Sequence, residues 1–286
     1  MRIAVCLKQV PDAASTLVID HATMRVVQAE PEPVYALNPP DRSALEVALR
    51  LVGRHGGTVT AVTLGPSESE AVLIQALARG ADGAVHLVGR EEPDAPAKAA
   101  LLSQVLRDLA PDLILLGDRS QDAGDGQVSA WLAEALALPL VAGCVGVKVE
   151  GSVVVAERNL GRGYRQVVTC PLPAVVAVET GAADPCYVSV YARSRVSAGR
   201  VRRVAADLRG LGEDDATAVR VLGVGPRRIR PKRLPAPDPR LAAADRLQLA
   251  LQGGVSERKG RLVSGTDSDV VKEIVAFLQE EGILTT

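Results

Sequence analysis

Strand-like apolar runs alternate with helix-like segments through roughly the first 140 residues of this 286-residue chain. A short apolar run bounded by turn residues is typical of a strand that is buried on both faces. Strict alternation of such strands with helices requires a parallel sheet covered by helices on both faces. The sequence therefore predicts an α/β fold, with ligand-binding loops at the carboxyl ends of the strands. The expected strands are about 2–10, 58–64, 84–88 and 113–116, and the expected helices are about 41–52, 68–78, 95–109 and 128–136.

The sequence becomes β-rich after Pro139. Glu150-Gly151-Ser152 separates two valine-rich runs, which is a hairpin signal. Two further strands are expected at 165–170 and 174–178, whereas the arginine-rich residues 184–203 are expected to form a loop. A small hairpin is also expected much earlier in the chain, within residues 16–28.

The last part of the chain has a different character. Residues 226–240 contain five prolines, which exclude a regular helix or a central strand and predict an extended arm. Residues 267–281 place apolar side chains on one helical face and acidic residues at the helix start. We therefore expect an α/β domain over 1–225, and an arm with a C-terminal helix over 226–286 that contacts a partner protein.

The stretch from Asp112 to Leu138 is the first candidate for a binding site. An apolar strand is followed by a glycine-bearing loop, Gly117 to Gly126, and then by a helix. This arrangement presents backbone N–H groups to an anion such as a nucleotide phosphate. An ordinary strand–helix loop has the same pattern, and Asp122 and Asp125 would repel an anion unless they turn away as caps. The loop matches neither GxGxxG nor the Walker pattern, so neither a Rossmann dinucleotide site nor an NTPase is supported.

Asn38-Pro39-Pro40-Asp41 is the second candidate. The prolines hold this segment extended before a helix, which Asp41 can cap, with Ser43 and Glu46 as a competing capping box. Two readings stay open here. The segment can present amide and backbone groups to an adenine or a ribose, or it can be a turn with an N-cap and nothing more.

Catalytic and metal-binding residues are not expected. His21, His55 and His86 lie far apart, and no HExxH, GxSxG or Cys/His ligand pattern occurs. The net charge of −1 gives no electrostatic reason to expect nucleic acid as a partner. The sequence therefore favours a binding or carrier subunit over an enzyme.

Cysteine usage and hydropathy indicate a cytoplasmic protein that does not insert into a membrane. The four cysteines show no CxxC spacing, and three of them lie in apolar strand-like runs, so we expect them to be reduced. The longest apolar-rich run, about 135–147, is too short and too broken to span a bilayer.

Several stretches of the chain match the motifs of one protein family in order and spacing. They are Leu7-Lys8-Gln9-Val10-Pro11-Asp12, Asn38-Pro39 with Asp41, Ala44, Leu45 and Glu46, Thr63-Leu64-Gly65-Pro66, Ala76-Leu77-Ala78-Arg79-Gly80-Ala81-Asp82, the loop Gly117 to Val128, and Leu172-Pro173-Ala174-Val175-Val176. Over nearly its full length the chain resembles the β (small) subunit of electron transfer flavoproteins.

That resemblance implies a Rossmann-like, adenine nucleotide-binding α/β domain and a heterodimer with an α subunit that holds the redox FAD. In conventional members of the family the β subunit binds AMP, and in electron-bifurcating members the same site takes a second FAD. The resemblance also implies that electrons pass from flavin dehydrogenases such as acyl-CoA dehydrogenases to a membrane quinone oxidoreductase. The positions that match the family's nucleotide contacts are Cys6, Asn38, Pro39, Pro40, Asp41, Leu64, Gly117, Asp118, Arg119, Ser120, Gln121, Asp122, Ala123, Gly124, Asp125, Gly126, Gln127 and Val128.

The chain departs from the family pattern at three places, one of which is residues 157–164, where the family has an acidic signature. In the glycine loop, residues 118–121 replace Arg-Gln-Ala-Ile of the family, and residues 123–125 replace Gly-Asp-Thr. The loop 186–193 stands where the family docks its dehydrogenases, and Val190 occupies the position of the apolar anchor. An alternative reading is therefore a stand-alone adenine nucleotide-binding or sensor protein of the same fold without flavin.

Overall fold

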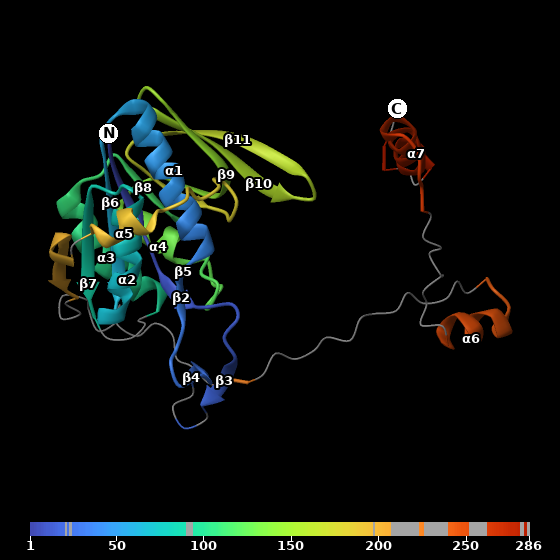
Figure 1. Cartoon of the computed structure of the whole chain (residues 1–286), viewed down its shortest axis with the longest axis horizontal. Coiled ribbons are helices and arrows are strands. Elements are labelled where there is room, and N and C mark those ends of the chain that lie inside the picture. Colours follow the sequence, from blue (N-terminus) through green and yellow to red (C-terminus); the bar gives the residue numbers. More distant parts are fainter. Residues whose placement is uncertain are drawn as a thin grey trace. The chain divides into compact units, whose positions relative to one another are not determined.

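The structure is a computed structural model of the whole chain (Figure 1). It divides into two compact units, Met1–Gly225 and Pro226–Thr286, which are described separately below. The residues that the structure describes are 1–20, 22, 25–89, 94–196, 198–206, 223–225, 240–251, 262–280 and 283–284.

The first unit is built on one nine-stranded sheet with the strand order β11-β10-β9-β12-β8-β1-β6-β7-β13. Neighbouring strands from β9 to β13 along this order pair in parallel, and β10 and β11 add an antiparallel extension beyond β9. The strands are β1 (Arg2–Cys6), β6 (Thr58–Gly65), β7 (Gly83–Val88), β8 (Leu113–Gly117), β9 (Leu140–Glu150), β10 (Val153–Gly161), β11 (Tyr164–Pro171), β12 (Ala174–Val178) and β13 (Val201–Ala205).

Helices cover both faces of this sheet, because successive strand side chains point to opposite sides. Ile3 and Val5 pack in one core cluster with residues of α1 (Pro39–His55) and α2 (Glu70–Arg79). Ala4 and Cys6 pack in a second cluster with residues of α3 (Ala95–Leu109) and α4 (Val128–Leu136). The predicted fold class, a parallel sheet with helices on both faces and a β-rich later segment, is confirmed.

The order of the strands places a switch point beside β1. The chain runs from β1 to β6 and β7 on one side, and then returns to β8 and β12 on the other side. In open α/β sheets the loops that leave two such diverging strands form a crevice at their carboxyl ends, where ligands bind. The loops after β1 and β8 therefore meet at the edge where a ligand is expected.

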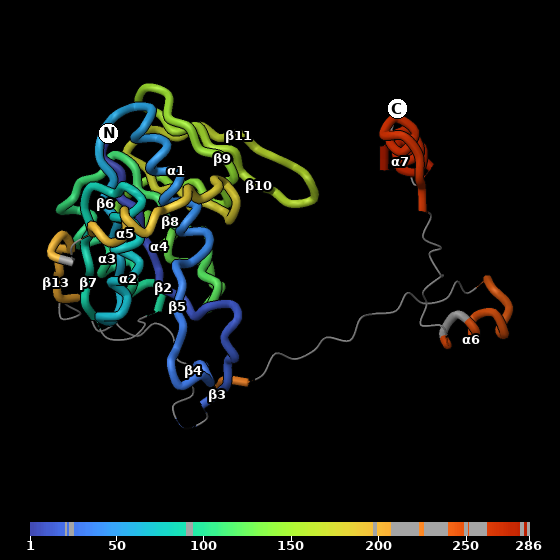
Figure 2. The backbone as a smooth tube through the Cα atoms, in the orientation of Figure 1, coloured from blue at the N-terminus to red at the C-terminus, as the bar shows by residue number. Residues whose placement is uncertain are grey.

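A small excursion leaves the sheet directly after β1. Its stem is the pair β2 (Gln9–Pro11) and β5 (Tyr35–Leu37), and its outer part is the antiparallel hairpin β3 (Leu17–Asp20) and β4 (Arg25–Gln28). The backbone trace shows this hairpin beyond the stem (Figure 2). The hairpin expected within residues 16–28 is thus present.

The residues between Asp184 and Arg203 differ from the loop that the sequence predicts. They contain the short helix α5 (Val190–Ser194), the 3-10 turn η2 (Ala198–Arg200) and the start of edge strand β13. β13 carries two exposed arginines between Val201 and Val204. An edge strand tolerates such charge because it pairs on one side only, and for this reason its sequence pattern is weak.

In the second unit the described elements are α6 (Ala243–Leu251), which the sequence did not predict, and α7 (Asp267–Glu280), which it did. The predicted extended arm, residues 226–240, lies outside the described residues except for Arg240. A 3-10 turn, η1 (Ser67–Ser69), precedes α2 in the first unit. None of the described helices has the length and apolar character needed to cross a membrane.

Candidate functional site

Asp41 lies at the centre of the switch point. Its carboxylate accepts a hydrogen bond from the backbone N–H of Lys8, at 2.7 Å, and another from the backbone N–H of Gly117, at 2.8 Å. Gly117 is the last residue of β8, and Lys8 lies two residues after the end of β1. One buried side chain therefore joins the start of α1 to both strands that diverge at the switch point.

This geometry corrects the expectation that Asp41 caps its helix. The helix begins at Pro39, Asn38 is the N-cap residue, and no side-chain cap hydrogen bond forms there. Asp41 sits within the first turn and points its carboxylate at the sheet, where two backbone N–H groups need acceptors. Burial raises the pKa of Asp41 to about 7, and the hydrogen bonds from Lys8, Asn38 and Gly117 oppose that rise.

Asn38 links the two candidate segments to each other. Its side-chain amide donates to the carbonyl of Arg119 at 3.1 Å, and its side-chain oxygen accepts from the backbone N–H of Gln121 at 3.0 Å. Asn38 is buried, and its own backbone N–H donates to the carbonyl of Lys8 at 2.9 Å. The segments Asn38–Asp41 and Gly117–Val128 are therefore parts of one site, although 76 residues separate Asp41 from Gly117.

The acidic residues of the loop are largely neutralised by neighbouring cations. Lys8 Nζ lies 2.6 Å from an oxygen of Asp122, and Arg119 Nε lies 2.8 Å from an oxygen of Asp118. Burial alone would raise the pKa of Asp122, but the hydrogen bond and charge of Lys8 hold this pKa below its ordinary value. The expected repulsion of an anion by Asp122 is thus offset, whereas Asp125 remains exposed.

The glycines of the loop serve its shape. A side chain on Gly117 would collide with the Asp41 carboxylate and would lie 2.8 Å from Pro40 Cβ. Gly124 and Gly126 have φ angles of 68° and 64°, in the left-handed region that glycine adopts without strain. The close approach at Gly117 is therefore an approach of α1 to β8, which the sequence pattern alone could not distinguish from an approach to phosphate.

The start of α4 borders the same loop. Residues 121–127 are exposed, and Gln127 at the N-cap position makes no side-chain cap hydrogen bond. The first N–H groups of a helix have no partner within the helix. This helix end can therefore offer backbone donors to an anion at the surface.

Cys6 and Leu64 occupy different surroundings from the rest of the predicted set. Both belong to the cluster on the α3 and α4 side of the sheet, at the ends of β1 and β6. Burial raises the pKa of the Cys6 thiol to about 12, and the nearby Asp41 carboxylate adds to the rise. A thiol with this pKa is not a nucleophile at neutral pH.

The predicted set of site residues leaves out Lys8 and Thr63. Lys8 supplies the ion pair with Asp122, and Thr63 donates its hydroxyl to the Leu7 carbonyl at 2.7 Å. Lys8 lies two residues after the end of β1 and Thr63 two residues before the end of β6, and this position near the carboxyl end of an apolar strand is the sequence signal that could have found them.

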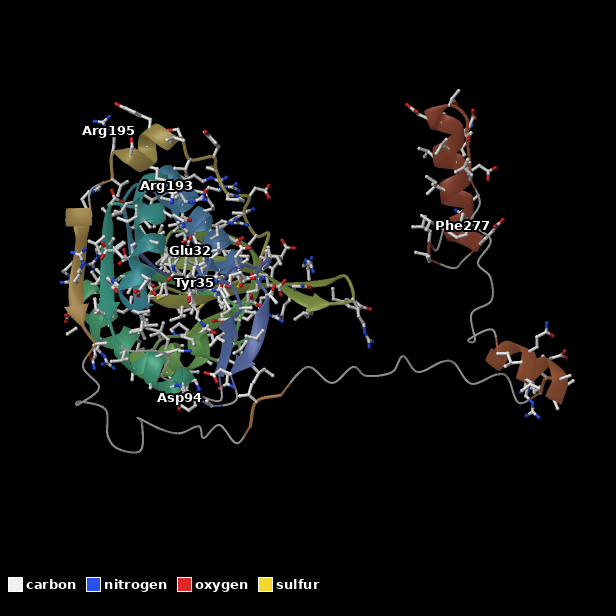
Figure 3. All side chains as sticks on the ribbon, turned by 60° about the horizontal axis from the view of Figure 1, so that its bottom comes forward. Glu32, Tyr35, Asp94, Arg193, Arg195 and Phe277 are labelled. Carbon is white, nitrogen blue, oxygen red and sulfur yellow. The ribbon has the colours of Figure 1, made fainter. Side chains whose placement is uncertain are left out.

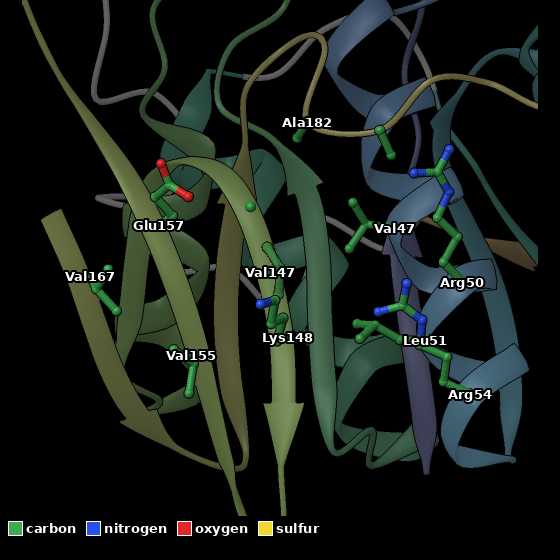
Figure 4. Close-up of a pocket in the computed structure, with 12 residues that line it drawn as sticks. Val47, Arg50, Leu51, Arg54, Val147, Lys148, Val155, Glu157, Val167 and Ala182 are labelled. Atoms are coloured by element: carbon green, nitrogen blue, oxygen red, sulfur yellow. The ribbon is translucent and has the colours of Figure 1, made fainter. Parts of the chain in front are cut away.

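Two cavities lie elsewhere in the first unit. One, of about 280 Å³, opens between the second half of α1 and strands β9 and β10, with Arg50, Arg54 and Lys148 beside it (Figure 4). The other, of about 390 Å³, lies beside Met1, His55 and Pro173. Neither is lined by any of the predicted site residues. The candidate site therefore lies apart from both of these cavities.

The fold and this edge define a class: an open, doubly wound α/β domain of the Rossmann-like kind, with its polar loops gathered at the switch point. Comparison with known proteins makes the assignment more specific. Residues 26–208 match the family described as "Electron transfer flavoprotein domain". The electron transfer flavoprotein subunit beta of Bacillus subtilis (strain 168) is 30% identical over 285 residues, which cover 98% of each chain.

Two further relatives cover less of the chain. The acryloyl-CoA reductase electron transfer subunit gamma of Anaerotignum propionicum is 32% identical over 197 residues, which are 66% of this chain and 72% of that one. The caffeyl-CoA reductase-Etf complex subunit CarD of Acetobacterium woodii is 34% identical over 194 residues, which are again 66% and 72%.

The chain belongs to the electron transfer flavoprotein β-subunit family. The resemblance seen in the sequence motifs is thereby confirmed. Proteins of this family are electron transfer subunits rather than catalytic enzymes, and they are associated with flavin at the level of the complex.

Proposed function

We propose that this chain is the β subunit of a heterodimeric electron transfer flavoprotein and that it holds an adenine nucleotide, AMP or a second FAD, at Asn38–Asp41 and Gly117–Val128. One observation carries the proposal. The Asn38 side chain bonds both the Arg119 carbonyl and the Gln121 N–H, which unites these segments at the carboxyl ends of the strands. Ligands of open α/β sheets bind at such a place.

The donors at this edge fit a phosphate that is bound mainly through backbone groups. Both nearby cations are already paired, Lys8 with Asp122 and Arg119 with Asp118. The start of α4 offers backbone N–H groups of its first turn, and the helix dipole there favours negative charge. Because AMP and FAD share an adenosine phosphate, one set of donors suits either ligand.

The chain itself supplies no redox group. A flavin held in the complex supplies electron transfer, and the protein positions the nucleotides and sets their surroundings. The redox FAD is shared with the α subunit. The electrons come from flavin dehydrogenases, of which acyl-CoA dehydrogenases are an example, and pass to a quinone oxidoreductase.

Two exposed apolar surfaces support contacts with other proteins. In the first unit, Tyr187, Val190 and Tyr191 are 87%, 80% and 68% exposed, in the loop whose family counterpart docks dehydrogenases. In the second unit, α7 exposes Val271, Ile274 and Phe277 on its apolar side, and Figure 3 labels Phe277 on this helix. An exposed apolar surface of this kind marks an interaction site.

Purification of the full-length chain with the subunits that accompany it tests the proposal. We expect a yellow complex that contains a second, flavin-binding subunit. Heat should release one FAD and one AMP per heterodimer in a conventional carrier, or two FAD in a bifurcating one, as identified by mass. A colourless protein that yields no adenine nucleotide would contradict the proposal.

The alternative is a nucleotide sensor that works without flavin. The altered residues 123–125 of the glycine loop favour it. It predicts a homo-oligomer that contains AMP or ATP and no flavin, so the solution mass and the absorption spectrum of the purified protein distinguish the two functions.

A further inference from the structure

His86 forms a buried polar network beside the candidate site. It lies in β7, fully buried, with ring Nε2 at 3.1 Å from the carbonyl oxygen of Gly65. Ring Nδ1 lies 3.7 Å from a carboxylate oxygen of Glu70, at the start of α2. Glu70 in turn holds Arg203 of β13 through two hydrogen bonds of 2.8 and 2.7 Å.

The contacts of the ring assign its protons. A carbonyl oxygen can only accept, so the hydrogen bond to Gly65 requires a proton on Nε2. Nδ1 is buried and has no hydrogen-bond partner among the described residues. A buried polar atom without a partner costs free energy, so a function of the ring is needed to explain why this position is not apolar.

The network ends at Gly65, the residue next to Leu64. Gly65 closes β6, and a side chain there would collide with Ser69, so the turn is tightly packed. The Gly65 carbonyl also accepts from the Gly89 N–H at 3.2 Å, which ties the turn to the end of β7 a second time.

Strand β6, which pairs with β7, carries further polar contacts towards the candidate site. Thr63 is the register partner of His86, and its hydroxyl donates to the Leu7 carbonyl at the end of β1. The next residue, Lys8, donates its N–H to Asp41 and pairs with Asp122. Contacts at the carboxyl edge thus run across four strands, from Arg203 of β13 to the nucleotide loop.

We propose that His86 is a positioning residue for the nucleotide. Its Nε2–H holds the Gly65 carbonyl and so fixes the end of β6, where Leu64 faces the proposed ligand, while Glu70 lies beside the ring. The inference rests on the proposed nucleotide site and adds to it a residue that does not touch the ligand.

The test measures AMP affinity, because the AMP moiety is common to both expected nucleotides. The full-length protein, in the assembly in which it purifies and dialysed free of nucleotide, is titrated with AMP by calorimetry. His86→Leu removes the donor and should weaken AMP binding about tenfold, the usual effect of one lost hydrogen bond. His86→Gln keeps an N–H near the Nε2 position and should restore affinity to within about twofold of the wild type.

Ser103→Ala is the matched control. Ser103 is also buried and also donates to a backbone carbonyl, that of Ala100, but it lies within α3. Its variant should bind AMP as the wild type does. Thermal unfolding of all the variants verifies that each is folded.

A second readout does not depend on affinity. In protein labelled with ¹⁵N-histidine, the ring signals of His86 should show a proton on Nε2 and should shift when AMP binds, whereas those of His55 should not. A folded His86→Leu variant with wild-type AMP affinity would overturn the inference and leave the nucleotide site standing. A wild type that binds no AMP would overturn the nucleotide site, and the inference with it.

Discussion

Asp41 shows how one residue can serve the fold and the site together. Burial raises its pKa to about 7, while an aspartate in an unfolded chain titrates near pH 4. Between these two pH values the folded protein holds a proton that the unfolded chain has released. The stability that this proton contributes is therefore complete below about pH 4 and is lost as the pH rises through about 7.

Replacement of Asp41 by Asn should remove this part of the pH dependence. In the wild type, the free energy of unfolding should fall by on the order of 4 kcal/mol between pH 4 and 7, because the unfolded chain releases a proton that the buried carboxyl retains. The difference between Asp41→Asn and wild type, measured by urea unfolding across this range, should change by a comparable amount. Parallel pH profiles for the two proteins would show that Asp41 does not titrate in this range.

The residues of the candidate site also show which of its features could not be predicted from the sequence. The segment Asn38–Asp41 and the loop Gly117–Val128 were both predicted as candidates, because their turn residues follow or precede apolar elements. Their union through the Asn38 side chain depends on the positions of β1 and β8 in the sheet, which local patterns do not contain. The same holds for Asp41, whose spacing suits a helix cap but whose partners belong to two strands.

At the scale of elements, the glycine loop has a shape that its backbone angles dictate. Gly126 has a φ of 64°, and a side chain there would lie 3.2 Å from the Asp118 carbonyl oxygen. Gly151, in the turn between β9 and β10, has a similar φ of 62° and open space around it. The two glycines therefore have the same left-handed backbone conformation but different surroundings.

This pair makes a matched experiment on the loop. An alanine at either position adopts left-handed backbone at a cost of about 1–2 kcal/mol. Gly126→Ala and Gly151→Ala should therefore both lower the free energy of unfolding, Gly126→Ala the more because of its contact with the Asp118 carbonyl oxygen, but only Gly126→Ala should weaken AMP binding, by about tenfold or more. Equal AMP affinities of the two variants would show that the glycine loop does not take part in AMP binding.

Most elements of the first unit could be predicted from the sequence, because buried parallel strands and amphipathic helices have strong patterns. The exceptions are instructive. Apart from Ala205, the apolar residues of β13 are only Val201 and Val204, which is too weak a pattern to predict a strand. Its position at the sheet edge depends on pairing with β7 and on the contact between Arg203 and Glu70. α5, with no buried residue, had no apolar face to reveal it.

At the scale of the whole molecule, the candidate nucleotide site lies within one of the two compact units. The described hydrogen bonds of the candidate site all lie within Met1–Gly225. The helix α7 of the second unit leaves Ile274 and Phe277 half-exposed, as expected of a helix that packs against another protein.

A chain that ends at Gly225 should therefore fold and keep its nucleotide site, but lose affinity for the flavin-binding subunit. We expect cooperative unfolding of the truncated chain and at least a tenfold weaker association, measured by analytical ultracentrifugation of mixtures with that subunit. Association as tight as that of the full-length chain would show that the second unit has another role.

The nucleotide content of the purified protein tests the central claim most directly. Released by heat and counted by mass, it should be one adenine nucleotide per wild-type chain beyond the redox FAD that the complex shares with the α subunit. Asn38→Ala removes both links to the loop and should reduce that content severalfold. Asn159→Ala should leave it unchanged, because Asn159 bonds Glu179 in the β-rich segment. A wild-type chain without adenine nucleotide, or an Asn38→Ala chain with a full complement, would contradict the site described here.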